Sequence, residues 1–411
     1  MTAMNTTTLP PKKRPVSLRI AVVTETCLPE INGVSVSLAH MLDGLLRLGH
    51  HIDLVRPRQS PQEVPQQKDC YRETLVTGLP IPGYPGLKTG LPARGKLLQW
   101  WAAARPDIVH IVTEGPLGWS ALSAARKLNI PVSSDFHTNF HSYTRHYGLG
   151  WLYKPVASYL RYLHNRADCT LVPTDELQRT LTDAGYTRVQ VVARGIDTVR
   201  FNPGKRSALL RSTWGASEEV QVVMLVSRLA AEKNLPLVIR AFRAMQQVNP
   251  YLRLVMVGDG PARAELQVQH PDVIFTGMKT GEELAQHYAS GDIFLYPSLT
   301  ETYGNVTVEA MASGLAVVAY DYAAARQHIR PGVNGLLAEF AHEEDFVHQA
   351  VRLAQRGTHI QDIRQAARHT VEELTWDRIN QALESVLLAC VANHQEEVKH
   401  DRTVATAEAD R

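Results

Sequence analysis

Two successive series of alternating strand-like and helix-like segments constrain the fold of this chain more than any other feature. Short runs rich in β-branched residues, starting at 19–24 (RIAVVT), alternate with segments of helical periodicity as far as about residue 340. This alternation is typical of parallel sheets covered by helices. The pattern lapses into Pro, Gly and charged residues over 194–207 and then resumes. Because 411 residues exceed what one hydrophobic core usually supports, we expect an α/β protein with two parallel-sheet domains.

The lapses in the pattern set the expected domain boundaries. We expect one domain over 18–195, a second over 196–375, a final helix over 376–392, and disordered polar ends at 1–17 and 396–411. The strands expected in the first domain are 19–24, 51–55, 107–112, 130–136, 169–173 and 189–193. Those expected in the second domain are 220–228, 252–260, 272–277, 292–298, 315–320 and 334–340.

The overall composition argues against several classes of protein. The net charge of +2 arises from 43 basic and 41 acidic residues, so the chain is not built around nucleic-acid phosphates. The 4 cysteines are far apart and lack the spacing of zinc ligands, which fits a reducing cytoplasm. The sequence contains no signal-peptide pattern and no run of about 18 apolar residues, so we expect a cytoplasmic protein that does not span a membrane.

Glycine-rich and polar clusters follow the predicted strands in both halves of the chain. Open parallel sheets bind ligands beyond the carboxyl ends of their strands, and these clusters stand at those ends. The sequence therefore predicts one site in a cleft between two facing domains. The clusters are 25–33 (ETCLPEING), 134–140 (SDFHTNF), 227–234 (SRLAAEKN), 258–261 (GDGP) and 297–305 (PSLTETYGN).

Three fingerprints of other chemistries are incomplete. The segment 258–263 (GDGPAR) would need a third glycine where Arg263 stands, so a tight turn is favoured over a dinucleotide site. No GxxxxGK[ST] phosphate loop occurs. His137 and His141 have the spacing of a zinc pair on a helix, but Thr138 replaces the glutamate of HExxH. We therefore expect no NAD, no P-loop ATP hydrolysis and no metal.

The cluster 227–234 places two basic residues just beyond a predicted buried strand. Arg228 and Lys233 stand at the end of the sheet that is expected to face the cleft. Pro236 and the apolar residues after it start a helix close by, whose positive end favours an anion. A pair of solvated surface charges is the alternative. A diphosphate is the ligand that this arrangement fits best.

The segment 301–314 (ETYGNVTVEAMASG) places two carboxylates around a predicted turn and helix start. Glu301 is expected in the loop, Gly304 in the turn, and Glu309 about one turn inside a helix over 306–313. Ionised carboxylates accept hydrogen bonds from the vicinal hydroxyls of a ribose or hexose. A metal is disfavoured because no third ligand is near in sequence. A glycosidase pair of carboxylates, or a Glu309 that merely solvates a helix face, remains an alternative.

Two windows of the first domain, 74–106 and 136–167, contain no acidic residue. Basic residues interleaved with Trp and Tyr suit the interface of an anionic bilayer. Ordinary solvated helices with buried aromatic residues are the alternative. RNA is disfavoured as a partner because no RNA-binding signature accompanies the windows. Their members include Lys88, Arg94, Trp100, Trp101, Tyr159, Tyr162 and Arg166.

In combination these motifs resemble a known family over roughly residues 19 to 390. SRLAAEKN, GDGP and ETYGNVTVEAMASG resemble the donor half of the retaining nucleotide-sugar glycosyltransferases. TETCLPEINGVSVSL and SDFHTNF are similar to the acceptor half of a subgroup that contains GDP-mannose-dependent α-mannosyltransferases and sulfoquinovosyl-diacylglycerol-synthase-like enzymes. The resemblance implies the GT-B fold, in which two Rossmann-like domains face a cleft and a C-terminal helix crosses back onto the first domain.

The resemblance also implies roles for residues of the second domain. Arg228 and Lys233 should hold the diphosphate of the donor and stabilise the departing nucleotide. Glu301 should bind hydroxyls of the donor sugar, and Glu309 should bind the ribose. The backbone amides implied in donor binding are those of Gly304, Asn305 and Val306.

In the first domain the resemblance implies two further site residues. Gly33 should let the first loop close against the diphosphate, and His137 should lie by the reacting face of the donor sugar. The implied catalytic group thus comprises His137, Arg228, Lys233 and Glu301. The chain departs from the family pattern at Ala193, where proline or asparagine is common, and at Tyr303, where phenylalanine is common. The first departure affects hinge geometry, and the second should be tolerated.

These observations favour a retaining glycosyltransferase that moves a hexose from a nucleoside-diphosphate sugar to a lipid or glycan, without metal or cofactor. Mannose from GDP-mannose is favoured by the resemblance, with a UDP-hexose as the alternative donor. The cytoplasmic face of a membrane is one expected location. A nucleotide-sugar epimerase or a sugar phosphorylase on the same fold is an alternative function. A sugar-nucleotide-binding protein without turnover is a second alternative.

Overall fold

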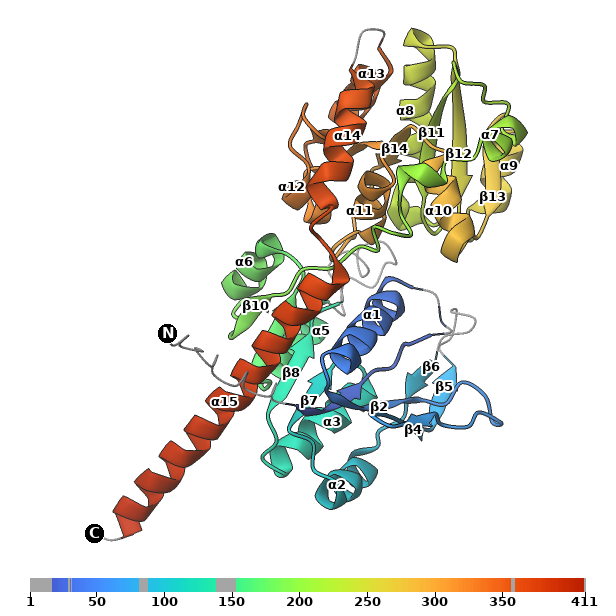
Figure 1. The fold of residues 1–411 in the computed structure, drawn as a ribbon. Coiled ribbons are helices and arrows are strands. Elements are labelled where there is room, and N and C mark those ends of the chain that lie inside the picture. Colours follow the sequence, from blue (N-terminus) through green and yellow to red (C-terminus); the bar gives the residue numbers. More distant parts are fainter. Residues whose placement is uncertain are drawn as a thin grey trace, which may run out of the picture.

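The computed structural model describes residues 17–80 except 29 and 31, together with 88–137, 153–355 and 359–409. Side chains are described within these ranges from residue 17 to residue 400, except that of Tyr153. The chain forms two α/β domains, each with its own parallel sheet, and the last helix runs from their junction along the first domain (Figure 1). The two sheet domains predicted from the sequence are therefore present.

The sheet of the first domain has the strand order β10-β9-β8-β7-β1-β2-β4-β3, and only the β3–β4 pair is antiparallel. A small antiparallel pair, β5–β6, stands apart from it. The strands are β1 Arg19–Val23, β2 His51–Pro57, β3 Gln67–Lys68, β4 Tyr71–Val76, β5 Gly78–Pro80, β6 Lys88–Gly90, β7 Ile108–Ile111, β8 Val132–Asp135, β9 Cys169–Val172 and β10 Val189–Val191. The helices are α1 Gly33–Arg47, α2 Arg94–Ala103, α3 Pro116–Lys127, α5 Tyr153–Asn165 and α6 Asp175–Asp183.

The sheet of the second domain is entirely parallel, with the order β13-β12-β11-β14-β15-β16. Its strands are β11 Gln221–Val226, β12 Leu252–Val257, β13 Ile274–Gly277, β14 Ile293–Tyr296, β15 Ala316–Tyr320 and β16 Leu336–Ala338. Its helices are η2 Pro203–Lys205, α7 Ala208–Thr213, η3 Ala231–Lys233, α8 Leu235–Val248, α9 Arg263–Gln269, α10 Gly281–Ala289, α11 Asn305–Ala312, α12 Ala323–His328, α13 Glu343–Ala354 and α14 Ile360–Val371.

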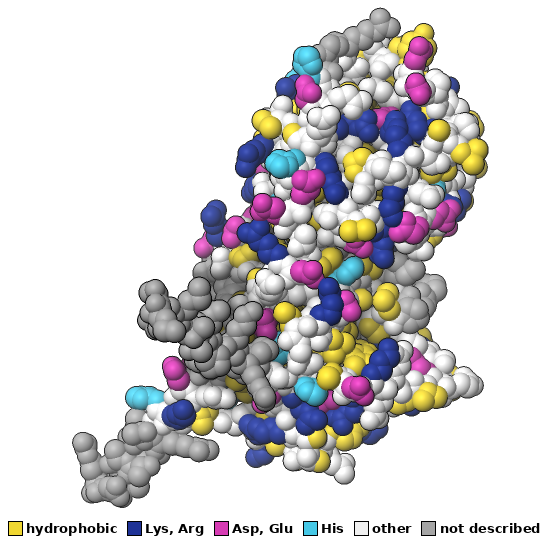
Figure 2. Space-filling view, in the orientation of Figure 1, with side chains coloured by type: hydrophobic (Ala, Val, Ile, Leu, Met, Phe, Trp, Pro, Cys, Tyr) yellow, Lys and Arg dark blue, Asp and Glu magenta, His cyan; other side chains and the backbone are white. Residues whose placement is uncertain are grey.

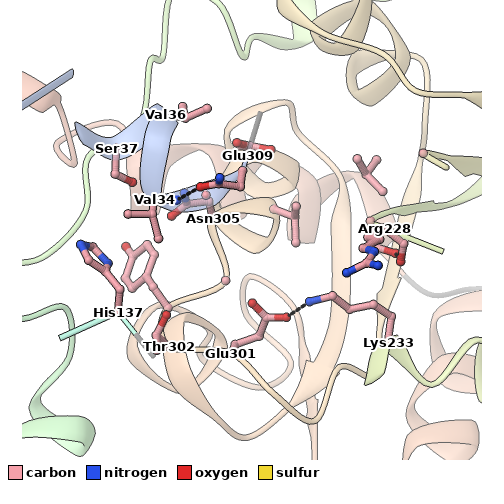
Figure 3. Close-up of a pocket in the computed structure, with 18 of the residues that line it drawn as sticks. Val34, Val36, Ser37, His137, Arg228, Lys233, Glu301, Thr302, Asn305 and Glu309 are labelled. Atoms are coloured by element: carbon pink, nitrogen blue, oxygen red, sulfur yellow. Dashed lines mark hydrogen bonds and ion pairs between the residues drawn. The ribbon is translucent and has the colours of Figure 1, made fainter. Parts of the chain in front are cut away.

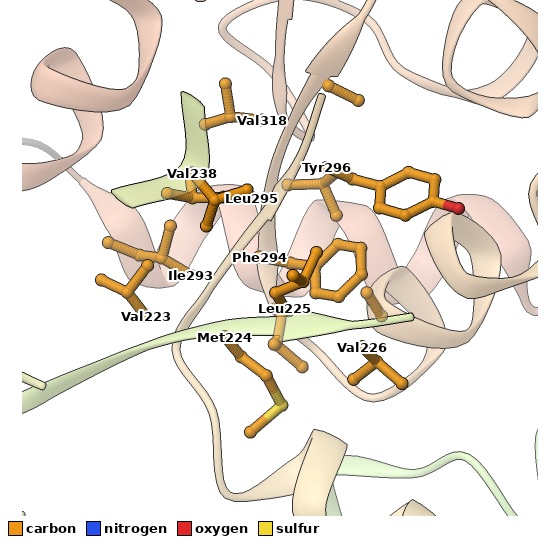
Figure 4. Packing of buried hydrophobic residues seen from close by; sticks show 14 of the residues in the cluster. Val223, Met224, Leu225, Val226, Val238, Ile293, Phe294, Leu295, Tyr296 and Val318 are labelled. Atoms are coloured by element: carbon orange, nitrogen blue, oxygen red, sulfur yellow. The ribbon is translucent and has the colours of Figure 1, made fainter. Parts of the chain in front are cut away.

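The central strands of the second sheet are buried on both faces, which is why they read as uninterrupted apolar runs. Leu225 of β11 and Phe294 of β14 are each 0% exposed, and Val238 of α8 packs against the same cluster (Figure 4). Burial of each such side chain contributes roughly 1.5–3 kcal/mol. This packing fixes the carboxyl ends of the strands, where Tyr296 ends β14 with its hydroxyl directed out of the cluster (Figure 4).

Every strand segment predicted from the sequence contains a strand, but the prediction missed the strands β3 to β6. Of these, β4 pairs in parallel with β2. Its pattern is obscured because the buried Glu73 occupies an interior position and accepts a hydrogen bond from Arg56 of β2 at 3.0 Å. A charged residue that is paired inside the sheet hides the apolar pattern of the strand.

Within the described residues, the chain passes between the domains at two adjoining places. The Ile196 N–H donates to the Leu374 carbonyl at 2.7 Å, so the outgoing and returning segments are hydrogen-bonded to each other. A Cβ at Gly195 would lie 2.8 Å from Cα of Trp376, which leaves room only for glycine. The junction predicted near 195 is therefore a close backbone crossing.

Helix α15 (Trp376–Ala409) returns to the first domain, as expected. Trp376 stacks on His40 with ring centroids 4.7 Å apart, and Leu383 and Leu387 are completely buried against the α1 side of the sheet. The expected end of this helix at 392 is wrong, and so is the expected disorder over 396–409, since the helix continues to Ala409 and projects past the domain (Figure 1). Residues 410 and 411 lie outside the described part. The segment 393–409 contains no Gly or Pro and many helix-favouring residues, which explains its continuation. Residues 1–16, also expected to be disordered, lie outside the described part.

None of the described helices combines the length and the apolar composition that a bilayer crossing requires.

Shortening Leu383 should destabilise the first domain, because this side chain belongs to the same cluster as Leu38 and Leu45 of α1. We expect Leu383→Ala to lower the free energy of unfolding by about 2–5 kcal/mol. The exposed Gln395 of the same helix provides the control, and Gln395→Ala should change stability by less than about 0.5 kcal/mol. Differential scanning calorimetry measures both variants. Equal stabilities would show that α15 is not part of the core.

Candidate active site

A cavity of about 720 Å³ lies between the two domains, and its walls are the loops at the carboxyl ends of both sheets. The first domain contributes the β1–α1 loop, Lys88 and His137. The second contributes the ends of β11 and β12, η3, and residues 300–306. This is the place where open parallel sheets bind ligands, so the predicted cleft is present.

The wall of the second domain is organised around an ion pair between Lys233 and Glu301 (Figure 3). Lys233 Nζ also lies 3.2 Å from the Tyr296 hydroxyl, which donates to Glu301 Oε1 at 2.6 Å. Ser298 Oγ donates to the same oxygen at 2.6 Å. Because Tyr296 ends β14 and Lys233 ends η3, two separate chain segments hold the charges in place.

Both partners of this pair are ionised. Burial alone would lower the pKa of Lys233, but the charge of Glu301 and the Tyr296 hydroxyl raise it well above its usual range. Burial alone would raise the pKa of Glu301, but Lys233, Ser298 and Tyr296 hold it below its usual range. The pocket therefore contains a fixed positive charge with a carboxylate beside it at neutral pH.

Arg228 is an exposed residue of the same wall, just beyond β11. Figure 3 shows its guanidinium next to the Lys233 side chain. The helix α8 begins at Leu235, two residues after Lys233, as the sequence predicted. Two cations on one wall of the cleft suit a ligand with more than one negative charge.

The start of helix α11 forms the next part of the wall. Gly304 has a φ of +91°, a conformation that glycine adopts without strain, and it supplies no side-chain cap to the helix. By contrast, the start of α1 is capped by Asn32 Oδ1, which accepts from the N–H groups of Val34 and Ser35 at 3.0 and 2.9 Å. Asn305 and Val306, at this helix start, line the cavity. Helix N-termini without a side-chain cap bind anions or hydroxyl oxygens.

Gly33 begins α1 on the opposite wall of the cavity. A Cβ at this position would lie 3.7 Å from Asn305 Nδ2, which is an ordinary contact. The two helix starts therefore face each other closely, but this conformation does not itself require a glycine. The predicted role of Gly33 in closing the loop stays a prediction.

Glu309 lies about one turn after the start of α11 and lines the cavity. Its Oε2 accepts a hydrogen bond from the Tyr288 hydroxyl at 2.9 Å. Burial raises its pKa from 4.5 to about 7, although the Tyr288 hydroxyl opposes the shift. Glu309 thus differs from Glu301, because it has a neutral hydrogen-bond donor where Glu301 has a cation.

His137 follows β8 at the other side of the cavity (Figure 3), and both of its ring nitrogens have partners. Nε2 lies 3.0 Å from Asp135 Oδ2, and Nδ1 lies 3.4 Å from Arg194 Nη2. An arginine only donates, so Nδ1 accepts and the ring proton on Nε2 points to Asp135. Asp135 is completely buried; burial opposes its ionisation, but His110, Arg194 and His137 hold its pKa well below the usual range.

The structure places all of the predicted site residues in the lining of this one cavity; their roles stay predictions. They are Gly33, His137, Arg228, Lys233, Glu301, Gly304, Asn305, Val306 and Glu309. His141, the other member of the zinc pair considered above, lies outside the described residues. Across the part of the chain that is described, no three His, Cys, Asp or Glu side chains are grouped so as to hold a metal ion.

The sequence did not single out several residues of the cavity. Glu25 and Glu30 lie on the wall of the first domain, and burial raises the pKa of both carboxyls. Lys88 was grouped with the surface windows, but it lines the cavity and its Nζ donates to the Gln59 carbonyl at 2.6 Å. Arg194 comes from the junction, where no local pattern signals a site. The only signal in the sequence was position: Glu25 and Glu30 stand in the polar cluster after β1, and Arg194 follows β10.

Known proteins match the chain along most of its length. Residues 31–200 match Glycosyltransferase Family 4, and residues 220–356 match Glycosyl transferases group 1. A GDP-mannose-dependent alpha-mannosyltransferase of Mycobacterium tuberculosis is 34% identical over 95% of this chain and 99% of its own length. The sulfoquinovosyl transferase SQD2 of Arabidopsis thaliana is 31% identical over 87% of this chain and 71% of its own length.

Solved structures show the same fold at lower identity. The sucrose-phosphate synthase of Thermosynechococcus elongatus superposes with a TM-score of 0.75 at 17% identity, covering 92% of this chain and 100% of its own. Anabaena HepE in complex with UDP-glucose superposes with a TM-score of 0.68 at 20% identity, covering 90% of this chain and 100% of its own. With a cleft between two parallel-sheet domains and relatives that match nearly end to end, the chain belongs to the glycosyltransferases of the GT-B fold.

Proposed function

We propose that this glycosyltransferase moves a mannosyl residue from GDP-mannose to a lipid or glycan hydroxyl with retention of configuration. Three relatives named GDP-mannose-dependent alpha-mannosyltransferase, each 33–34% identical over 78–95% of this chain, support the donor. The observation that carries the proposal is the cavity wall in which Arg228, Lys233 and the start of α11 converge. These groups fit the diphosphate of a sugar nucleotide.

The chemistry required of the site is the stabilisation of a developing diphosphate. As the bond between the anomeric carbon and the phosphate oxygen lengthens, negative charge grows on that oxygen and the sugar gains oxocarbenium character. Lys233 and Arg228 offset this charge, and the amides of Asn305 and Val306 donate to the phosphate oxygens. Glu301 fixes Lys233 and accepts hydrogen bonds from sugar hydroxyls. We propose that fixed cations take the place of a metal in this reaction.

Glu309 fits the ribose of the donor. A carboxylate accepts hydrogen bonds from two vicinal hydroxyls, and α11 places this side chain one turn behind the proposed diphosphate site. The carboxylate accepts a hydrogen bond from the Tyr288 hydroxyl, and burial raises its pKa to about 7. Hydrogen bonds from the ribose favour the ionised form. Donor binding is therefore expected to release a proton near neutral pH.

In the proposed reaction His137 lies beside the donor sugar, but it does not accept the proton of the acceptor hydroxyl. Its Nδ1 already accepts from Arg194, and its Nε2 proton is directed to Asp135. The acceptor hydroxyl must therefore lose its proton to another base. The oxygen of the departing phosphate lies on the face from which a retaining transfer takes place, and we assign the proton to that oxygen. A bond from the acceptor oxygen to the anomeric carbon forms as the bond from carbon to phosphate oxygen breaks.

We further propose that the first domain docks on an anionic bilayer. Three exposed aromatic residues, Trp119 of α3 with Tyr159 and Tyr162 of α5, form an aromatic patch with exposed fractions of 38%, 36% and 48%. The ring centroids of Trp119 lie 5.7 and 5.5 Å from those of Tyr159 and Tyr162. The Arg166 guanidinium stacks on Tyr162 at 4.9 Å. Amphipathic aromatic rings beside arginine suit the headgroup region of a membrane.

Basic side chains continue from this patch. Arg126 Nη1 donates to the Arg166 carbonyl at 2.9 Å, and Arg105 donates to the carbonyls of Leu128 and Asn129 at the end of α3. Figure 2 shows Lys and Arg gathered along the edge of the first domain at the bottom of the view. In the first acid-free window, by contrast, Trp101 is buried in the core with Trp100 packed against it, so the membrane interpretation fails for those two residues.

Removal of the Lys233 cation tests the proposed reaction. We expect Lys233→Ala to lower kcat for mannosyl transfer by about 10²-fold, because a preorganised charge in the pocket is lost. Arg228→Ala should also lower kcat, because it removes the second cation of the same wall. Lys205→Ala is the matched control in the same domain, since Lys205 does not line the cavity. The assay follows transfer from GDP-mannose, with product analysis in the presence and absence of an acceptor. Near-normal turnover of Lys233→Ala would contradict the proposal.

The buried Glu309 carboxyl predicts a pH-dependent stability. Its pKa of about 7 in the folded protein lies above the ordinary 4.5, so the folded state holds a proton that the unfolded chain has lost. The ligand-free protein therefore loses stability as pH rises from about 4.5 to about 7. Glu309→Gln should be more stable than the wild type by about 1–3 kcal/mol near pH 8 and nearly equal to it near pH 5. Thermal unfolding at both pH values measures this. An unchanged difference between them would rule out this titration.

Vesicle flotation tests the proposed membrane contact. At low salt the protein should float with phosphatidylglycerol vesicles and not with pure phosphatidylcholine vesicles, because the basic edge requires anionic headgroups. Trp119→Ala combined with Arg166→Ala should weaken this binding severalfold. Tyr251→Ala removes a 55% exposed aromatic residue from the second domain and should have no effect. If the wild type fails to bind anionic vesicles at low salt, the docking proposal is wrong.

A further inference from the structure

The hydroxyl of Tyr303 makes a contact at the domain junction that a phenylalanine would not make. Tyr303 lies in the donor loop, defined here as residues 301–305, and is only 4% exposed. Its hydroxyl donates to the carbonyl of Arg194 at 3.3 Å and lies 3.0 Å from Nε2 of His328. The carbonyl can only accept, so the hydroxyl proton points to Arg194 and the His328 N–H donates to the tyrosine oxygen.

His328 keeps this arrangement through the physiological pH range. Burial lowers its pKa to about 4, so the imidazole is neutral near pH 7. A neutral imidazole with its proton on Nε2 is the donor that the Tyr303 oxygen needs. The backbone of His328 is held as well, since its carbonyl accepts from Asn334 Nδ2 at 2.9 Å. Tyr303 is thus fixed from the second domain while its proton points to the junction.

Arg194 connects this contact to the opposite wall of the cavity. It is 4% exposed and lines the cavity immediately before Gly195, the close crossing of the two domains. Its Nη2 lies 3.5 Å from Asp135 Oδ2 and 3.4 Å from Nδ1 of His137. Arg194 therefore contacts the donor loop through its backbone carbonyl and orients His137 through its guanidinium.

These three contacts of Arg194 are longer than well-formed ones. Hydrogen bonds from a hydroxyl to an oxygen usually measure about 2.5–3.0 Å, those from an N–H group about 2.7–3.2 Å, and those between a guanidinium and a carboxylate about 2.7–2.9 Å. The distances of 3.3, 3.4 and 3.5 Å from the Arg194 carbonyl to Tyr303 and from its guanidinium to His137 and Asp135 leave room for all three to shorten together. Such contacts tighten when a ligand draws the walls of a cleft together. A movement of the donor loop would then shift Arg194, and Arg194 would in turn shift His137.

We propose that the Tyr303 hydroxyl is a positioning group that couples the donor loop to the orientation of His137 through Arg194. The proposal rests on the proposed glycosyl transfer, in which the donor occupies the loop and His137 borders the reacting sugar. The aromatic ring of Tyr303 belongs to the core of the second domain, a place that phenylalanine fills equally well. The hydroxyl is therefore the part of this side chain that serves the coupling.

Tyr303→Phe removes the hydroxyl and keeps the ring. We expect kcat to fall by about 3- to 10-fold, the effect of one lost hydrogen bond, with the KM for the donor nearly unchanged. Tyr320→Phe is the matched control, because Tyr320 is 2% exposed in the same domain but does not line the cavity. Assays well below the unfolding temperatures of all three proteins exclude a loss of folded enzyme. Unchanged kcat in Tyr303→Phe, or an equal loss in Tyr320→Phe, would overturn the proposal.

A second measurement does not depend on turnover. The imidazole nitrogen resonances of His137, assigned with a His137→Asn variant, report its hydrogen bonds by NMR. Addition of GDP or UDP should shift these resonances in the wild type and leave them nearly unshifted in Tyr303→Phe. Equal shifts in both proteins would show that the hydroxyl does not transmit the occupancy of the donor site. Absence of transfer by the wild type would instead contradict the proposed function, and the NMR comparison would still decide the coupling.

Discussion

The ion pair between Lys233 and Glu301 is the interaction on which the cleft depends. Neither charge is stable alone in this position, because burial opposes the ionisation of both side chains. Each holds the other ionised, and the hydroxyls of Tyr296 and Ser298 complete the arrangement. The partners come from η3 and from the loop after β14, so the pair also ties together two segments that the buried strands only bring near each other. A positive charge is thereby fixed before any ligand arrives, which is what electrostatic stabilisation of a departing diphosphate requires.

The second constraint is the junction that sets one wall against the other. The outgoing and returning segments are hydrogen-bonded at Ile196 and pass so closely that Gly195 has no room for a side chain. Helix α15 then anchors the returning segment on the first domain through Trp376 and Leu383. The contacts of Arg194 lie at this crossing, where a small rotation changes both walls of the cavity at once.

The sequence predicted the parts of the fold that follow from local pattern. The strands of the second sheet were found because they are buried on both faces and read as apolar runs, whereas β4 was missed because Glu73 is paired inside the sheet. The donor loop was found because the carboxylate of Glu301, the turn glycine and the helix start are adjacent in sequence. Arg194 was not found, since its importance arises from contacts with residues 57 to 109 positions away. The helix beyond residue 392 was missed because most side chains over 393–400 are exposed, so no apolar face marks the helix in the sequence.

The two walls of the cavity, one from each domain, have different roles in the proposed transfer. The second domain supplies the cations and helix start that receive the leaving group. Across the cleft, His137 has no ring nitrogen left to accept a proton, and Asp135 is completely buried behind it. In the proposed transfer the proton of the acceptor passes to the phosphate oxygen that the second domain stabilises. That oxygen stays on the face it leaves, so an acceptor that delivers its proton there attacks from the same face. In the proposed transfer the second domain therefore holds the leaving group, and the first domain contributes the position of the acceptor.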